Sequence, residues 1–269
     1  MRAAAPATRP HEPGRGLDSI ADHQPQPFGH RARSDRTGSL NTDDTLVWYA
    51  AYGSNLLAAR FRFYLEGGTP DGTTRVYSGF RNRRPPVRSA PMTLPGCVYF
   101  SGESRVWGGG MAFYAPQRCA GWPGQAAARG YLLTVGQFAD LVEQEMHRCA
   151  RAELDLTRVL RDGRDALGPG RYETLVRVGE LDGHPILTCT APGTPTAVEL
   201  RPPSARYLSL IATGLHETHG WPHHRIRAYT AELPGIRDHW NHADLDTVIR
   251  TALGIATSPA ADPVQPTPP

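Results

Sequence analysis

The chain has 269 residues and a mass of 29.4 kDa, which suffices for one large domain or two small ones. Its formal net charge is only +3, and no apolar run approaches the roughly 20 residues that a membrane span needs, so the composition indicates neither a nucleic-acid nor a membrane partner. The sequence contains no lysine, which excludes a Schiff-base lysine and a Walker-type phosphate-binding lysine.

The two ends of the chain differ in composition from the middle. Residues 1–44 contain hardly any apolar side chains and cannot bury enough surface to offset the entropy of ordering them, so we expect a disordered leader. Residues 256–269 are rich in proline, and we expect a disordered tail there. Residues 45–255 are predicted to form the folded domain.

Four cysteines are present: Cys97, Cys119, Cys149 and Cys189. They form no CxxC pair, and their spacing is too wide for a zinc ribbon or a redox motif. The pattern is typical of buried thiols in a reducing compartment, so we expect a cytoplasmic protein.

The apolar pattern predicts secondary structure throughout the folded region. In chain order, we expect a strand at residues 45–52, a helix at 56–65, strands at 97–100, 110–114 and 130–134, helices at 135–149 and 155–167, strands at 172–179 and 184–190, and helices at 205–219, 225–232 and 244–253. Asp182-Gly183 is a typical hairpin turn between the last two strands. Because strands dominate the first two thirds and helices the end, the order predicts an α+β fold.

The first predicted strand leads through Gly53, Ser54 and Asn55 directly into a helix. Ser54 or Asn55 can cap that helix, and the free N–H groups of the turn can hold a carboxylate or a developing oxyanion. Gly53 is expected to allow either a positive φ or a close approach of the substrate to the backbone. Many strand–turn–helix joints use the same residue types only to turn the chain, so both interpretations stay open.

The helix predicted at residues 135–149 carries a carboxylate in an unusual place. Apolar side chains recur there every three or four residues and define one buried face. Glu145 lies on that face, whereas Glu143 is predicted to point to solvent on the opposite one. A buried carboxylate is costly, so Glu145 is expected either to pair with an arginine or to serve in proton transfer.

A histidine cluster is a candidate metal site. Its members are His216, His219, His223 and His224. The first two share a helix face, but the segment does not read HExxH and a Gly-Trp-Pro break separates the pairs, so the pattern favours a polar helix end.

Arginines surround the pair Pro85-Pro86. They are Arg81, Arg83, Arg84 and Arg88. Such a segment can hold a phosphate or a carboxylate, but a solvated surface run is the favoured interpretation.

Several motifs occur together in the order typical of one family. Residues 49–56 (YAAYGSNL) resemble the opening strand and YGSN loop of the γ-glutamylcyclotransferase family, and residues 107–116 (WGGGMAFYAP) resemble its glycine-paired strand. Residues 130–134 followed by LVEQE at 141–145 resemble its strand–helix unit, which ends in the catalytic glutamate. The segments at 170–172 and 203–207 fall where that family has a Tyr-led strand and a helix with a substrate-contacting tyrosine.

The resemblance covers roughly residues 45–231 and implies a fold, a site and a ligand. The implied fold is a mixed β-barrel-like sheet flanked by helices. The implied ligand is a small-molecule γ-glutamyl compound, with no metal or other cofactor, and the oligomeric state is left open. Glu145 matches the catalytic residue. The residues matched to substrate binding are Tyr49, Ala50, Ala51, Tyr52, Gly53, Ser54 and Tyr207.

In the implied reaction, the α-amino group of a γ-glutamyl amide attacks the amide's own γ-carbonyl, releasing an amine and 5-oxoproline. Two alternatives stay open. One is a water-using amidase or deacylase on the same scaffold. The other is a non-catalytic binding protein, which the departures from the family pattern at Ala50 and Met146 favour.

Overall fold

The computed structural model describes residues 45–148 and 154–256. The predicted leader at residues 1–44, Cys149 and all of the predicted tail except residue 256 therefore lie outside the described residues. None of the helices in the described part of the chain is both long and apolar enough to cross a membrane.

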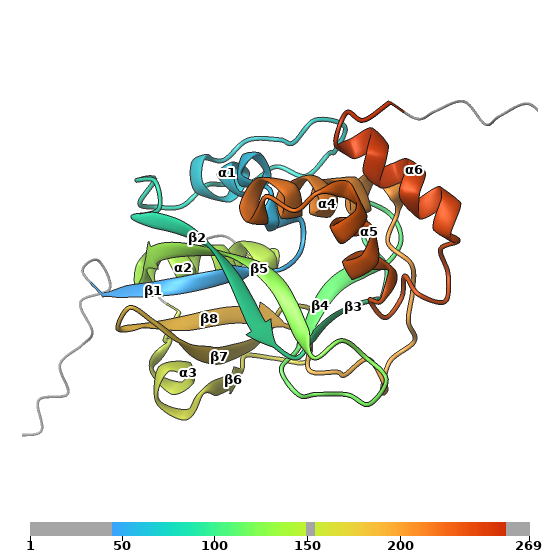
Figure 1. Ribbon diagram of the computed structural model, residues 1–269. Helices are drawn as coiled ribbons and strands as arrows, with labels where there is room; N and C mark the ends of the chain where they lie inside the picture. Colours follow the sequence, from blue (N-terminus) through green and yellow to red (C-terminus); the bar gives the residue numbers. More distant parts are fainter. Residues whose placement is uncertain (1–44, 149–153, 257–269) are drawn as a thin grey trace, which may run out of the picture. The chain divides into compact units, whose positions relative to one another are not determined.

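A six-stranded mixed sheet lies at the centre of the described residues, with the strand order β2-β5-β1-β8-β7-β6 (Figure 1). Its strands are β1 (Leu46–Ala51), β2 (Arg88–Pro95), β5 (Gln125–Thr134), β6 (Arg164–Ala166), β7 (Thr174–Leu181) and β8 (His184–Thr190). β1 pairs antiparallel with β5 and parallel with β8, so it is a central strand with a neighbour on each side.

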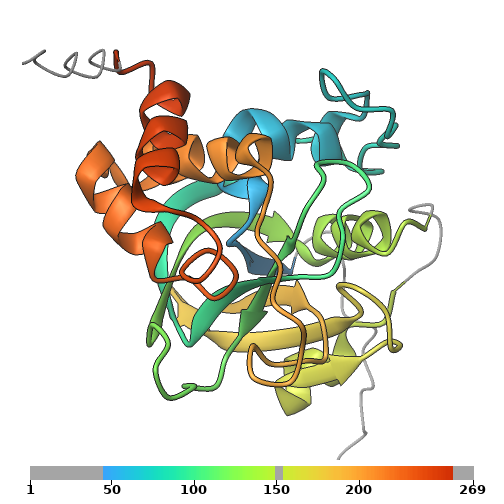
Figure 2. The same ribbon diagram turned by 90° about the vertical axis from the view of Figure 1, so that its right-hand side faces the viewer.

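Helices and a second sheet cover the central one. The second sheet pairs β3 (Cys97–Ser101) with β4 (Met111–Ala115) and packs against β5 and β8. The helices are η1 (Ser54–Leu56, a 3-10 helix), α1 (Ala58–Glu66), α2 (Val135–Glu145), α3 (Thr157–Asp162), α4 (Ala205–His219), α5 (His223–Ala231) and α6 (His242–Ala252). Figure 2 shows α5 and α6 on one side of the strands and α2 on the other. The predicted α+β class, with a mixed sheet flanked by helices, is confirmed.

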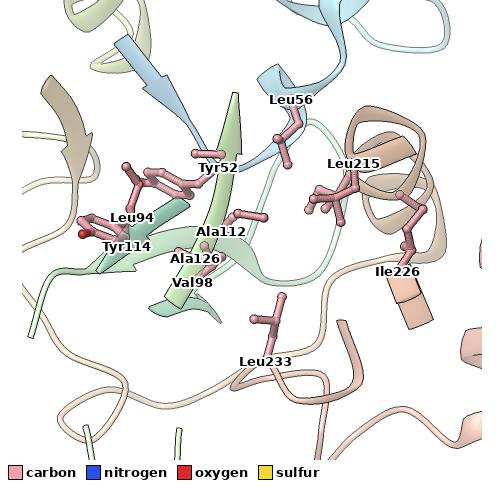
Figure 3. Packing of buried hydrophobic residues seen from close by; sticks show 14 of the residues in the cluster. Tyr52, Leu56, Leu94, Val98, Ala112, Tyr114, Ala126, Leu215, Ile226 and Leu233 are labelled. Carbon is pink, nitrogen blue, oxygen red and sulfur yellow. The ribbon is translucent and has the colours of Figure 1, made fainter. Parts of the chain in front are cut away.

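The two faces of the central sheet belong to different apolar clusters. Trp48 and Ala50 of β1 pack with side chains of α4, α5 and α6, whereas Tyr49 and Ala51 pack with side chains of α1 and α2. Alternation along one strand therefore serves two cores, as expected for a strand that is buried on both faces. Figure 3 shows part of the first cluster, where Leu215 of α4 lies among the labelled side chains.

Several predicted elements are confirmed. The strand predicted at residues 45–52 is β1, and the helix predicted at residues 205–219 is α4 with the same bounds. The predicted hairpin is formed by β7 and β8, and its turn residues Asp182 and Gly183 have φ values of 51° and 76°. Positive φ at both central residues is what a tight type I′ hairpin turn requires.

The strand β2 lies in a segment for which no element is predicted. β2 contains Pro91 and Pro95, and proline normally argues against a strand. The structure resolves this conflict because β2 is the edge strand of the sheet and pairs within it only with β5, and a sheet edge is where proline is tolerated in a strand.

The helix predicted at residues 155–167 is wrong in its length. α3 ends at Asp162 because Gly163 adopts a left-handed conformation with φ of 79°, a common way to terminate a helix. The following residues form β6, which pairs antiparallel with β7. Likewise α2 ends at Glu145, four residues before the predicted end.

We expect Gly214→Ala to destabilise the protein although alanine is the better helix former. Gly214 lies in α4, and a Cβ there would stand 2.5 Å from Leu56 Cβ and 2.6 Å from the backbone nitrogen of Leu57. Overpacking of this kind costs about 1–3 kcal/mol, more than the helix-propensity gain of about 1 kcal/mol. Chemical denaturation measures the difference.

The matched control is Ser209→Ala in the same helix. Among the described residues, the Ser209 hydroxyl bonds only to the Ala205 carbonyl of its own helix, so its removal should change the free energy of unfolding by less than about 0.5 kcal/mol. Equal stability of the wild type and the Gly214→Ala variant would show that α4 and η1 are not closely packed at this position.

Candidate functional site

A cavity opens where β1 ends and the chain turns into η1. Its walls come from the loop at residues 53–55, α1, the end of α2 and the start of α4. The cavity volume is about 110 Å³, and since a single water needs only roughly 10–15 Å³ on the same measure, it has room for a small molecule. Most of the predicted site residues line it: Tyr49, Tyr52, Gly53, Ser54, Glu145 and Tyr207.

Two predicted substrate-binding residues lie elsewhere. Ala50 and Ala51 are fully buried in β1 and belong to the two apolar clusters rather than to the cavity wall. The carbonyl oxygen of Ala50 accepts a hydrogen bond from Thr188 Oγ1 at 2.8 Å. Consecutive side chains of a strand point to opposite faces, so the side chain of Ala50 points away from the face on which Tyr49 reaches the cavity.

The loop side chains do not cap a helix, contrary to the prediction. Neither η1 nor α1 has a side-chain cap. Asn55 is instead buried, and its Nδ2 donates to Tyr49 Oη at 3.2 Å and lies 3.5 Å from Glu145 Oε1. Its backbone carbonyl accepts from Tyr131 Oη at 2.8 Å. Asn55 therefore joins the loop to the end of α2.

Gly53 has a φ of −109°, so the expected positive φ is absent. Glycine is needed at this position because neighbouring side chains leave no room for a Cβ. A Cβ at this position would lie 2.9 Å from the hydroxyl oxygen of Tyr207 and 3.4 Å from Ala112 Cβ. Tyr207 stands in the first turn of α4, which Ser204 caps by accepting from the Tyr207 N–H. The tyrosine hydroxyl consequently rests directly on the loop.

Glu145 is the last residue of α2, and its half-buried side chain lines the cavity. The helix begins with a capping box in which Thr134 and Gln137 satisfy each other's backbone N–H groups. Glu143 is only 4% exposed, so the prediction that it points to solvent is wrong. The prediction assumed one buried face, whereas nine residues of α2 are buried and cover most of its circumference.

Tyrosines surround the carboxylate. Burial raises the pKa of Tyr49, Tyr64 and Tyr172 well above the usual range, and the negative charge of Glu145 raises each further. Burial also raises the pKa of Tyr207 to about 12, although the backbone N–H groups of Ala112 and Ser54 act in the opposite direction. These hydroxyls therefore remain protonated hydrogen-bond donors near neutral pH.

Arg60 is a cavity residue that the sequence analysis missed. It is only 4% exposed, and its guanidinium lies over the rings of Tyr64, Tyr77 and Trp107 at 5.0, 4.5 and 5.5 Å from their centroids. Its Nη2 donates to Tyr77 Oη. A signal was available, because Arg60 stands four residues before Tyr64 and so shares its helix face.

Further positive charge gathers around the same cavity. Arg75, Arg105 and Arg171 line it together with His147. Burial and the charges of these three arginines lower the pKa of His147, which keeps its imidazole neutral. Among the described lining residues Glu145 is the sole carboxylate, so the cavity as a whole is electropositive and suits a ligand with negative charge.

The other two sequence candidates lie away from this cavity. The arginines at positions 81, 83, 84 and 88 are exposed, as predicted, and Arg81 also pairs with the buried Asp140 of α2 at 2.8 Å. Within residues 45–148 and 154–256, no group of three or more His, Cys, Asp and Glu side chains is arranged to hold a metal ion. His216, His219 and His223 lie against separate groups: the carbonyl oxygens of Trp221 and Ala128 and the carboxylate of Asp246.

Comparison with known proteins yields a few similarities, and no family model matches this chain. Over 216 residues it is 32% identical to "Histone deacetylase 5" of Arabidopsis thaliana, an alignment that covers 74% of this chain and 31% of the plant protein. The chain therefore spans about a third of the length of this curated relative.

Two solved structures are similar over 77% of this chain and 99% of their own. One is a "Gamma-glutamyl cyclotransferase" with a TM-score of 0.41 and 17% identity. The other is an uncharacterised protein from Homo sapiens, with a TM-score of 0.41 and 18% identity. The residues of the cavity, rather than these similarities, are the basis for a function.

We expect Gly53→Ala and Tyr207→Phe to be energetically coupled. Alone, Gly53→Ala should lower the free energy of unfolding by about 1 kcal/mol or more, because the new methyl group meets the Tyr207 oxygen. In the Tyr207→Phe background that oxygen is gone, so the same change should cost at least about 0.5 kcal/mol less. A double-mutant cycle by denaturant unfolding measures this, and strict additivity would place Tyr207 away from the loop.

Proposed function

We propose that this protein is a γ-glutamylcyclotransferase-like enzyme that releases an amine and 5-oxoproline from a γ-glutamyl amide, with Glu145 as the general acid/base. One observation carries the proposal: the carboxylate of Glu145 reaches the loop at residues 53–55, with Oε1 3.5 Å from Asn55 Nδ2, inside a cavity walled by tyrosines. The motifs that resemble the family thus meet at one place in the fold.

The reaction needs little from the protein besides position and proton transfer. Glu145 takes a proton from the substrate's α-ammonium group, and the freed amine forms a bond with the γ-carbonyl carbon. The amide C–N bond then breaks as Glu145 returns the proton to the leaving amine. The second proton of the ring nitrogen also passes to that amine, which departs as an ammonium ion, and the ring nitrogen keeps one hydrogen as the lactam N–H. Because nucleophile and carbonyl belong to one molecule, holding it in the closed conformation supplies much of the rate enhancement.

The cavity also offers donors for the oxyanion of the tetrahedral intermediate. In this proposal the hydroxyl of Tyr207 and the backbone N–H groups of Gly53 and Ser54 hold either that oxygen or the glutamyl carboxylate. The raised pKa of Tyr207, about 12, supports its role as a donor.

Cys189 lines the cavity and carries a thiol, which is a nucleophile when ionised, and its surroundings oppose that role. Burial raises the pKa of its thiol well above the usual value, and the charge of Glu145 raises it further. A neutral thiol is a poor nucleophile. This supports a mechanism in which the nucleophile comes from the substrate.

The second candidate function is hydrolysis of an amide at the same site, with Glu145 activating water. The alignment with the plant protein named "Histone deacetylase 5" covers 31% of that protein, and its name keeps a deacylase reaction as the alternative. Mass spectrometry of a γ-glutamyl amide library after incubation with the protein separates the two. We expect 5-oxoproline, whereas free glutamate would establish hydrolysis, and binding without any product would establish a non-catalytic protein.

We expect Glu145→Gln to reduce 5-oxoproline formation by at least about 100-fold, because it keeps the side-chain volume and removes the proton acceptor. The matched control is Glu143→Gln in the same helix. Glu143 is buried but does not line the cavity, so its loss should leave turnover per folded molecule unchanged even if stability falls. If the wild type and the Glu145→Gln variant form 5-oxoproline at comparable rates, Glu145 is not the general acid/base.

A further inference from the structure

The Arg60 guanidinium is a buried cation without a counter-ion. Of its three nitrogens, Nε and Nη1 have no hydrogen-bond partner among the described residues, and only Nη2 donates, to Tyr77. None of the ion pairs within the described part of the chain involves Arg60. Buried charges in proteins are normally paired, so this one lacks the anion that its position requires.

The aromatic rings around Arg60 explain how the buried charge is tolerated when no ligand is bound. The faces of Tyr64, Tyr77 and Trp107 attract the cation, but they contribute no acceptor for its free N–H groups. A carboxylate is the matching partner, because it accepts charge-assisted hydrogen bonds from a guanidinium. Since Arg60 lines the cavity, that carboxylate can come from a ligand.

A second residue with an unpartnered polar atom lines the same cavity, and this atom is an acceptor rather than a donor. Asn55 Oδ1 is a buried acceptor without a partner among the described residues, and it belongs to the side chain that approaches Glu145. Glu145 and Arg60 thus offer opposite charges in one cavity without forming an ion pair with each other. A ligand that fits between them carries an ammonium group and a carboxylate.

We propose that Arg60 is a substrate-binding residue, which holds the α-carboxylate of the γ-glutamyl group while the α-ammonium lies beside Glu145 and Asn55. The choice of ligand rests on the proposed function, whereas the need for a carboxylate at Arg60 rests on its own unpaired nitrogens. Holding both substituents of the α-carbon fixes the direction from which the amine approaches the γ-carbonyl.

Binding of the product tests the assignment without turnover. Titration calorimetry should show that wild type binds 5-oxoproline about 10- to 100-fold more tightly than its neutral analogue 5-oxoprolinamide. Arg60→Gln should abolish this preference, and Arg60→Lys should restore part of it because a positive charge returns. The matched control is Arg62→Gln, which removes an equal charge from the exposed side of the same helix and should keep the preference.

Kinetics separate the α-carboxylate from a carboxylate on the leaving half. With γ-glutamyl ethylamide, whose leaving amine is neutral, Arg60→Gln should raise KM about 10-fold or more and change kcat little, because the carboxylate keeps its charge throughout the reaction. The opposite result would be an Arg60→Gln variant that leaves KM for γ-glutamyl ethylamide unchanged but no longer prefers γ-glutamylglycine over it. Arg60 would then contact a carboxylate on the leaving amine rather than the α-carboxylate.

Failure of this assignment is distinguishable from failure of the proposed function. If 5-oxoproline does not bind, or if folded Arg60→Gln protein retains the acid-over-amide preference, Arg60 is not the carboxylate-binding residue, whatever the turnover. If binding depends on Arg60 but no γ-glutamyl amide yields 5-oxoproline, the proposed reaction fails and the binding role stands.

Discussion

The separation of two opposite charges within one aromatic-walled cavity is the constraint on which the site depends. Glu145 and Arg60 are each carried by a helix that flanks β1, and neither forms an ion pair with the other. If they met, each would neutralise its partner and leave nothing for a ligand. Because they are held apart, each charge remains available to a ligand. A zwitterion of the right length can place its ammonium group beside Glu145 and its carboxylate beside Arg60.

The fold positions the two helices through contacts that do not involve the two charges. α2 follows β5 directly and is fixed at its start by the capping box of Thr134 and Gln137. Near its other end, Gln144 Nε2 donates to the carbonyl of Tyr64 in α1 at 3.1 Å. This hydrogen bond joins the two helices one residue before Glu145, so the end of α2 is held in place without an ion pair between the carboxylate and the guanidinium.

The sequence predicted much of this arrangement because short-range patterns decide it. The apolar run of β1, the Asp182-Gly183 turn and the full length of α4 follow from local rules of periodicity and turn chemistry. β2 escaped prediction because its prolines are acceptable only at a sheet edge, and a strand's position in the sheet is a property of the whole fold.

The candidate site shows the same division. Tyr52, Gly53 and Glu145 were found from motifs and do line one cavity. Arg60 was missed because an arginine on a helix is ordinarily solvated, and only the assembled rings around it show that this one is buried. Glu143 was assigned to solvent because one apolar face was assumed, whereas tertiary contacts bury most of α2.

A crystal structure of the full chain with 5-oxoproline bound would show where the carboxylate of the ligand lies. We expect the carboxylate within hydrogen-bond distance of the Arg60 guanidinium. The ring nitrogen, which was the attacking amine, should lie beside Glu145. A ligand seated with its carboxylate away from Arg60, or outside this cavity, would contradict the claim that the separated charges form the binding site.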